Sequence, residues 1–420
     1  MREWREVSIG AHLKLTSGFP FASSHFSNEG TPLIRIRDVL TSNTETYFNG
    51  AFPPGYIIKR GNILIGMDGD FHIVRWRGCD ALLNQRVLKV DVQDESVVVL
   101  DYLYHWLGPF VKKINDVTAA TTVKHLSTKD LTRARTSVPP VVTQRRIAAI
   151  LTSIDTAIEK TEALVAKYQQ IKAGLMHDLL TRGVLPDGTL RPSREQAPEL
   201  YHETTVGLIP REWNLSDCGQ MFAIDSGITL GPHRRPAKRP HAYLRVANIH
   251  RDEIRLHDVA KLEALPGETE YSLKKYDLLV VEGHANRSEI GRCAMVFDDA
   301  EGMLFQNHLF RLRSSILDAQ YALLWMNSHH AQRYWESACA TSSGLNTINK
   351  KMLRSMAVCV PSNNEQKQIA ETAFTIRQML RTEADKLRKL QHQKLGLMQD
   401  LLTGKVPVQP VPEPLDTTDA

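Results

Sequence analysis

Two short polar triplets stand inside otherwise apolar runs of this 420-residue sequence. The triplet 84–86 (Asn-Gln-Arg) interrupts the run 81–88, and the triplet 306–308 (Gln-Asn-His) interrupts the run 304–310. Arg pairs bidentately with guanine, and Asn or Gln pairs with adenine, so these side chains are suited to reading base edges. The same side chains also satisfy backbone groups where a strand turns, and the sequence leaves both interpretations open.

Other polar segments accompany the triplets. The segments 121–125 (Thr-Thr-Val-Lys-His) and 342–346 (Ser-Ser-Gly-Leu-Asn) combine small hydroxyl residues with Lys, Gly or Asn, which suits contacts to phosphate groups. The segments 35–39 (Arg-Ile-Arg-Asp-Val) and 245–249 (Arg-Val-Ala-Asn-Ile) correspond to each other and add basic side chains. The candidate DNA-contacting residues are Arg35, Arg37, Asn84, Gln85, Arg86, Lys124, Arg245, Asn248, Arg287, Gln306, Asn307, His308 and Asn346.

Sequence signatures of catalysis are missing. The chain has no Walker-type P-loop, no His-Glu-x-x-His and no Gly-x-Ser-x-Gly, nor an amino-methyltransferase motif of the Asn/Asp-Pro-Pro-Tyr/Phe type. Asp277 and Glu282 could be read as a nuclease carboxylate pair. The matching stretch 62–69 in the first half does not keep both carboxylates, which favours the end of a strand running into a loop. We therefore predict no catalytic residues.

The five cysteines are odd in number, widely spaced and without a Cys-x-x-Cys pair. This pattern predicts neither a disulfide framework nor a zinc site, and we expect buried thiols and no metal ligands. The cysteines are Cys79, Cys218, Cys293, Cys339 and Cys359.

The bulk composition resembles that of an ordinary globular protein, with 42% hydrophobic and 24% charged residues. There is no apolar run long enough to span a membrane and no apolar signal-peptide core at the N-terminus, so we expect a cytoplasmic chain. The length suggests two to four domains. A net charge of +5 and a pI of about 8.8 permit nucleic-acid binding without requiring it.

The sequence consists of two related halves. Trp4 opens a segment that can be laid on the one opened by Trp213, and the segment 172–181 reappears almost unchanged as 394–403. A repeat of about 210–222 residues is far longer than a solenoid unit, and it indicates two copies of a domain followed by a helix.

Each half ends in a long predicted helix. Residues 144–181 contain no Pro and one Gly, and a stripe starting at Ile147 alternates spacings of four and three. The second half keeps this frame from Ile369. Each stripe is too narrow for a globular core, which favours two helices that face each other over helices that pack only on their own domains. The predicted seam consists of Ile147, Leu151, Ile154, Ile158, Ile369, Ile376, Leu380 and Leu387.

Changes in composition predict the boundaries between these parts. Short β-type runs punctuated by Gly and Pro mark the mixed domains, and stretches rich in Pro and charge mark connections. The expected order is a mixed domain at 1–143, a helix at 144–184, a linker at 185–210, a second mixed domain at 211–365, a helix at 366–406 and a disordered tail at 407–420.

With these motifs in place, nearly the whole chain resembles the specificity subunits of Type I restriction–modification enzymes. The segment 63–71 followed by 82–86 looks like one type of target-recognition domain in that family. The segment 278–283 followed by 306–308 looks like another. Two departures are the missing acidic residue before Gln144 and the interruption of a glycine cluster by His284.

The resemblance implies an α+β fold with two similar mixed α/β target-recognition domains and two long helices that form an antiparallel coiled-coil spacer. It implies a bipartite, asymmetric double-stranded DNA target and no catalysis by this chain. Two methylation subunits would dock on the helices, and restriction subunits would join through them. S-adenosylmethionine, ATP and Mg are expected on those partners, with no cofactor bound by this chain. The alternatives are an enzyme that itself modifies or cuts DNA, and a coiled-coil adaptor that does not bind DNA.

Overall fold

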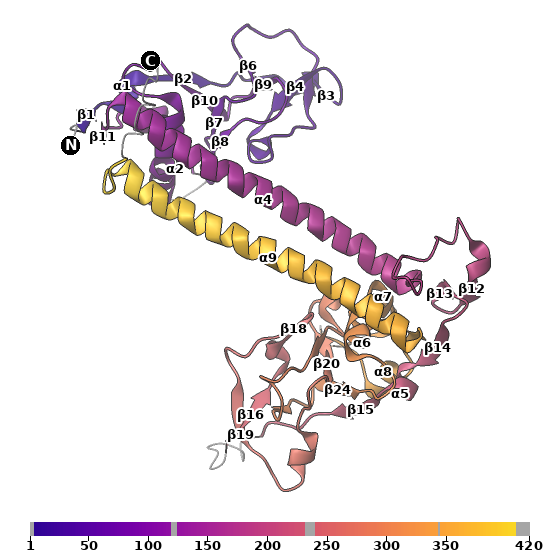
Figure 1. Cartoon of the computed structure of the whole chain (residues 1–420). Helices are drawn as coiled ribbons and strands as arrows, with labels where there is room; N and C mark the ends of the chain where they lie inside the picture. The colour runs from indigo at the N-terminus through magenta and orange to yellow at the C-terminus, as the bar shows by residue number, and fades with distance from the viewer. Residues whose placement is uncertain (1–3, 119–123, 232–239, 343–344, 409–420) are drawn as a thin grey trace, which may run out of the picture. The chain divides into compact units, whose positions relative to one another are not determined.

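The computed structural model describes residues 4–118, 124–231, 240–342 and 345–408, and it divides into two compact units (Figure 1). Unit 1 is drawn from residues 1–163 and 385–420, and unit 2 from residues 164–384. The two long helices, α4 (Val141–Thr181) and α9 (Asn363–Leu402), each contribute one half to each unit. Among the described residues, no helix is both long and apolar enough to cross a membrane.

Unit 1 is built on a four-stranded antiparallel sheet in the order β2-β10-β7-β8. In β7, Ile63 and Ile65 belong to the cluster that contains helix α2, whereas Leu64 belongs to a different cluster. Both faces of this strand are therefore covered, which explains its unbroken apolar run. These elements are β2 (Leu13–Ser17), β7 (Ile63–Gly66), β8 (Ile73–Arg75), β10 (Val87–Val92) and α2 (Leu100–Val117).

A second sheet in unit 1, in the order β3-β5-β4-β9-β6, carries the first polar triplet directly after β9. Strands β4 and β9 are parallel, while the other pairs are antiparallel. The sheet consists of β3 (Phe26–Ser27), β4 (Thr31–Ile34), β5 (Tyr47–Phe48), β6 (Ile57–Ile58) and β9 (Ala81–Leu83). The remaining elements include β1 (Arg5–Val7), α1 (Ile9–His12), α3 (Thr128–Thr132) and β11 (Thr136–Val138), and β1 pairs with β11.

Unit 2 repeats this plan. Its main sheet has the order β15-β24-β20-β22, and a parallel pair, β16 with β23, stands in the place of β4 with β9. The duplication expected from the sequence, and with it the α+β class, is thus confirmed at the level of strand order. The elements include β14 (Asn214–Asp217), α5 (Cys218–Met221), β15 (Ala223–Ser226), β16 (Pro240–Leu244), β19 (Ala260–Glu263), β20 (Leu278–Val281), β22 (Cys293–Met295), β23 (Leu304–Phe305), β24 (Leu309–Arg313), α6 (Ala319–Met326), α7 (His329–Ala338), α8 (Lys350–Arg354) and β27 (Ala357–Val360).

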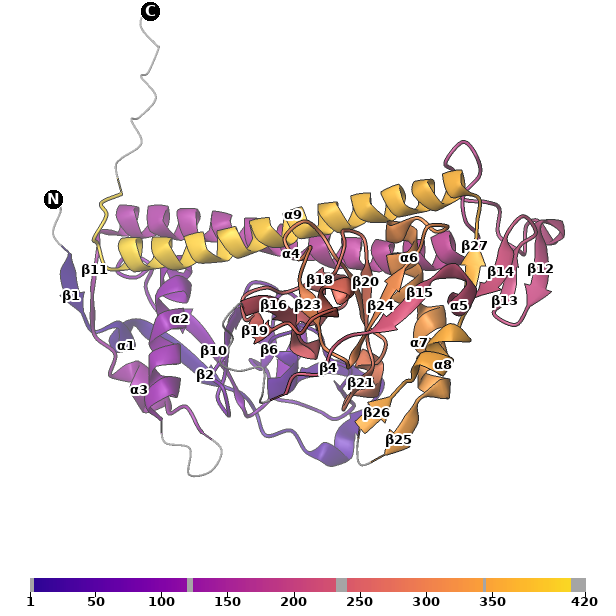
Figure 2. The same cartoon turned by 90° about the horizontal axis from the view of Figure 1, so that it is seen from below.

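The long helices run antiparallel. In unit 1, Ile147 near the start of α4 lies in one core cluster with Leu401 near the end of α9. In unit 2, Leu179 near the end of α4 shares a cluster with Ile369 near the start of α9. In unit 1 this cluster also contains residues of α2, which lies against the helix pair (Figure 2). The pairing therefore joins each helix both to the other helix and to a domain core.

The residues of the predicted seam are among the least exposed of each helix. Both stripes stay inward because the alternating spacing of four and three keeps them on one face of the helix. The buried residues are Ile147, Leu151, Ile154, Ile369 and Ile376, and the half-buried residues are Ile158, Leu380 and Leu387.

The stretch 185–210, predicted from its composition to be a linker, is a folded part of unit 2. It contains a hairpin of β12 (Tyr201–Thr204) and β13 (Gly207–Pro210). Arg191 is only 3% exposed, and its Nη1 lies 3.0 Å from Oε1 of Glu365 on α9. A buried ion pair thus holds this segment against α9, although its content of Pro and charged residues is typical of an unstructured linker. Residues 409–420, most of the predicted disordered tail, lie outside the described part of the chain.

Candidate nucleic-acid interface

In unit 1, three segments meet at the end of β7. The backbone N–H of Met67 donates to the Arg86 carbonyl at 3.1 Å, and the N–H of Leu126 donates to the Met67 carbonyl at 2.7 Å. Asp68 lies between them. Its Oδ2 is 3.4 Å from Nε of Arg86, and its Oδ1 is 2.6 Å from Nδ1 of His125. The Arg86 side chain is 55% exposed, so one carboxylate orients a cation that remains open to solvent.

Unit 2 has the same arrangement with different residues. The N–H of Glu282 donates to the His308 carbonyl at 3.1 Å, and the N–H of Ile348 donates to the Glu282 carbonyl at 2.9 Å. His308 Nδ1 lies 2.6 Å from Oε2 of Glu282, and the His308 side chain is 57% exposed. An acidic residue after the central strand therefore holds the last residue of the triplet in each unit.

A glycine lets the chain approach each triplet closely. A Cβ on Gly18 would lie 1.9 Å from the Asn84 carbonyl oxygen, and a Cβ on Gly227 would lie 2.1 Å from that of Phe305. Real Cβ atoms do not come this near to backbone oxygens, so neither position accepts a side chain without movement of the backbone. The matching pair Gly18 and Gly227, visible in the sequence, thus serves to place the triplets.

Several predicted contact residues instead support their own loops. Asn248 is 3% exposed, and its side chain accepts the Arg245 N–H at 2.8 Å and donates to the Arg255 carbonyl at 3.0 Å. Gln306 Oε1 accepts the Val246 N–H at 3.1 Å. For Asn248 and Gln306 the geometry agrees with the structural interpretation of these amides, because their polar atoms satisfy backbone groups.

Three further candidates are held by hydrogen bonds. Lys124 Nζ donates to the Asn115 carbonyl at 2.7 Å, and Asn346 Nδ2 donates to the Ala285 carbonyl at 3.1 Å. Arg287 donates to the Glu336 carbonyl.

The remaining candidates lie at or near the surface. Asn84 Oδ1 accepts the N–H of Gln85 at 2.8 Å. Arg245 Nη2 lies 2.7 Å from Oδ2 of Asp258. Arg37 and Gln85 are exposed, whereas Arg35, Asn84, Arg245 and Asn307 are half-buried.

The sequence profile of the Type I restriction modification DNA specificity domain matches residues 1–168 and 210–392. The chain belongs to this family. It is 29% identical over 411 residues to the Type I restriction enzyme EcoBI specificity subunit of Escherichia coli, covering 95% of this chain and 83% of that protein. It is 22% identical to the MjaVIII specificity subunit of Methanocaldococcus jannaschii, covering 97% of this chain and 94% of that protein.

A solved structure has the same fold. The S subunit of a Type I restriction–modification system from M. genitalium superposes with a TM-score of 0.60 at 15% sequence identity, over 97% of each chain. The mixed domains and long helices of the present chain therefore have the fold of that S subunit.

In this member of the specificity family, the sequence pointed to Glu282 only as half of a possible nuclease pair, and its patterns did not predict that Asp68 and Glu282 hold Arg86 and His308. Glu282 directly follows β20, and Asp68 follows β7 after one intervening residue. An acidic residue at the end of the equivalent strand in each half was the signal that could have revealed this role. The proposed partner of Glu282 in a nuclease pair, Asp277, is 1% exposed and held by both Nε and Nη2 of Arg313 at 2.6 Å. Asp277 therefore has a structural role.

All five cysteines are free, and burial raises the pKa of Cys218 to about 12, which keeps that thiol neutral. The expectation that all five would be buried is wrong for two of them: Cys339 is half-buried, and Cys79 is exposed in a surface bend after Trp76. In the described part of the chain, no three His, Cys, Asp or Glu side chains are placed to hold a metal ion.

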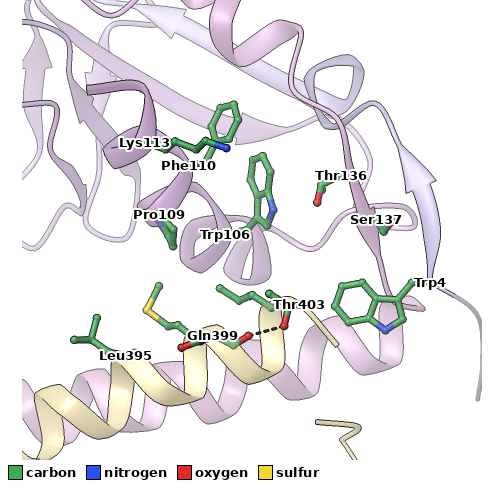
Figure 3. Close-up of a pocket in the computed structure, with 12 residues that line it drawn as sticks. Trp4, Trp106, Pro109, Phe110, Lys113, Thr136, Ser137, Leu395, Gln399 and Thr403 are labelled. Atoms are coloured by element: carbon green, nitrogen blue, oxygen red, sulfur yellow. Dashed lines mark hydrogen bonds between the residues drawn. The ribbon is translucent and has the colours of Figure 1, made fainter. Parts of the chain in front are cut away.

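Unit 1 also has an apolar groove of about 610 Å³ where α2 faces the end of α9 (Figure 3). Trp106 and Phe110 stack with their ring centroids 4.7 Å apart, and Figure 3 shows both rings on the side of the groove opposite Leu395. Leu395 is 67% exposed, although it is a large aliphatic residue on a well-packed helix. Apolar side chains left open in a concave surface are typical of protein contact sites.

Proposed function

We propose that this chain selects an asymmetric, bipartite double-stranded DNA target, with one half read by each unit. The single observation that carries the proposal is the recurrence of one arrangement with different side chains. Asp68 holds Arg86 in unit 1, and Glu282 holds His308 at the same place in unit 2. Arg and His present different hydrogen-bonding patterns to base edges, so two equivalent surfaces would select different sequences.

A domain exchange tests this proposal. The complete system is expressed in cells, and the methylated adenines of their DNA are mapped by sequencing. A chain whose residues 1–143 come from another family member should change one half of the target and leave the other half unchanged. A palindromic target, or a change in both halves, would contradict the proposal.

The second part of the proposal is that the helix pair binds two methylation subunits, through which restriction subunits join. Large apolar side chains that lie outside the seam and are open to solvent support it, because contact with a protein would bury them. On the two helices these residues are Val142, Ile150, Ile171, Phe374, Met379 and Leu395.

In this proposal the chain has no catalytic step and no cofactor of its own. S-adenosylmethionine, ATP and Mg act on the partner subunits. Purified chain incubated with duplex DNA and all three reagents should leave the DNA neither methylated nor cut. Adding the methylation subunits to the same mixture should restore methylation, which controls for the quality of the chain.

A further inference from the structure

Unit 2 contains a basic cavity that lies apart from the triplet and its acidic partner. It has a volume of about 260 Å³ and is lined by the second half of α4, the first half of α9, the turn at 251–252 and the start of α7. Its charged and titratable lining residues include Lys172, His177, Arg251, His329 and Arg377. Asp252 is the one carboxylate among the described residues that line it.

Asp252 is already engaged by other groups. Its Oδ1 accepts a hydrogen bond from Nδ2 of Asn327 at 2.7 Å, and its Oδ2 lies 3.3 Å from Nη2 of Arg377. Arg251 is held by uncharged acceptors, since its guanidinium donates to Oδ1 of Asn327 at 3.3 Å and to the Ser288 carbonyl at 3.0 Å. The single carboxylate therefore leaves the positive charge of the cavity largely uncompensated.

Part of this charge is withdrawn from water. Lys172 is half-buried, and burial together with the nearby Arg377 guanidinium lowers the pKa of its ammonium group. The Nε of Arg377 is buried and has no hydrogen-bond partner. Like charges in a partly desolvated site oppose each other unless an anion compensates them.

The internal repeat shows that helix packing does not require this excess charge. Lys172 and Arg377 occupy the positions that Lys394 and Asp155 occupy in the other copy. In unit 1, Lys394 Nζ and Asp155 Oδ1 form an ion pair at 2.6 Å. The same two helix positions thus carry opposite charges in unit 1 and two positive charges in unit 2.

We propose that the cavity in unit 2 binds a phosphate group. Guanidinium and ammonium groups donate strong charge-assisted hydrogen bonds to phosphate oxygens, and Arg suits their geometry in particular. A phosphate held by Lys172, Arg251 and Arg377 would connect α4, α9 and the turn at 251–252. It would stiffen the junction between the helix pair and the domain of unit 2. The phosphate belongs either to a small molecule or to the DNA backbone.

Thermal unfolding of the full chain tests the proposal. Inorganic phosphate is titrated against sodium chloride at constant ionic strength, and phosphate should raise the melting temperature in a saturable way. The Arg377→Asp variant recreates the ion pair of unit 1 with Lys172, and its apparent phosphate affinity should fall about tenfold or more. Lys167→Asp is the matched control, because Lys167 is exposed on the same segment of α4 and does not line the cavity.

Each outcome decides the question. A saturable phosphate response in the wild type and in Lys167→Asp, lost in Arg377→Asp, supports the site. A wild-type response equal to that of chloride, or a full response in Arg377→Asp, overturns it. If Arg377→Asp already melts lower in chloride alone, Lys172→Gln decides by the same criteria.

Duplex binding by the same variants separates the two sources of phosphate. If the DNA backbone fills the cavity, Arg377→Asp should weaken duplex binding for all sequences alike, and free phosphate should compete with the duplex. If a small molecule fills the cavity, Arg377→Asp should bind the duplex as tightly as Lys167→Asp does. Arg377→Asp should still lose the thermal response to phosphate.

Discussion

The Gln144 carboxamide oxygen accepts the backbone N–H of Val99 at 2.9 Å. Gln144 is fully buried near the start of α4, and its Nε2 also donates to the Pro139 carbonyl at 2.9 Å. Gln366 repeats the relationship in unit 2, where Oε1 accepts the N–H of Asp318 at 2.8 Å. One glutamine side chain in each copy thus joins the start of a long helix to the first residue before a domain helix. That residue is Val99 before α2 in unit 1 and Asp318 before α6 in unit 2.

Replacing Gln144 with Leu should destabilise unit 1 by about 1–3 kcal/mol, because the buried Val99 N–H loses its acceptor. Denaturant unfolding of the full chain measures the effect, with exposed Arg145→Ala as the control on the same turn. Unchanged stability in Gln144→Leu would mean that water or another group satisfies Val99.

Arg86→Ala should relax specificity at one position in one half of the target and weaken binding by roughly 1–3 kcal/mol if Arg86 reads a guanine. Its exposed ion pair with Asp68 predicts a change in stability below about 1 kcal/mol. Binding and melting curves are measured side by side, with His308→Ala expected to affect the other half. A loss of stability with unchanged specificity would assign Arg86 a structural role.

Ile154→Asp should weaken helix pairing by several kcal/mol, because it places a charge where Ile154 is buried in the seam. We expect loss of DNA modification in cells while the separate domain cores remain folded. Ser153→Asp adds the same charge at the exposed neighbouring position and serves as the control. Full DNA modification by the Ile154→Asp chain would contradict the interpretation that α4 and α9 pair through this seam.

His105 predicts an acid-sensitive unit 1. Burial lowers its pKa to about 4, although Asp155, 3.8 Å away, acts in the opposite direction. The unfolded chain takes up this proton near pH 6.5, so the stability is complete above about 6.5, falls as the pH drops and levels off below about 4. The full effect is up to about 3 kcal/mol. His105→Gln should flatten the pH dependence of unfolding in this window, and an unchanged slope would assign it to other groups.

If the helix pair determines the distance between the two half-sites, a longer helix should increase that distance. Seven residues inserted near Thr161 keep the heptad phase and add about 10 Å. The gap should then grow by at most about three base pairs, at about 3.4 Å per pair. The half-site sequences should not change. Sequencing of methylated DNA measures the gap, and an unchanged gap with full activity would show that the helices do not determine spacing.

The local patterns of the sequence were sufficient to predict the duplication and the two long helices. Heptad spacing keeps Ile147 and Ile369 on one face of each helix, and that property depends only on neighbours along the chain. The unbroken apolar run of β7 likewise follows from its two covered faces.

The tertiary structure decided which polar side chains are free to act. Asp68 and His125, or Glu282 and His308, meet only because distant segments fold to one edge of a sheet. Arg191 holds a Pro-rich stretch against the core of unit 2 because it pairs with the buried Glu365, which lies 174 residues further along the chain. Lys172 and Arg377 likewise line one basic cavity only because the two long helices run side by side. Charge and hydrogen bonding act over a few ångströms of space, so the sequence determined the elements and the fold determined their chemistry.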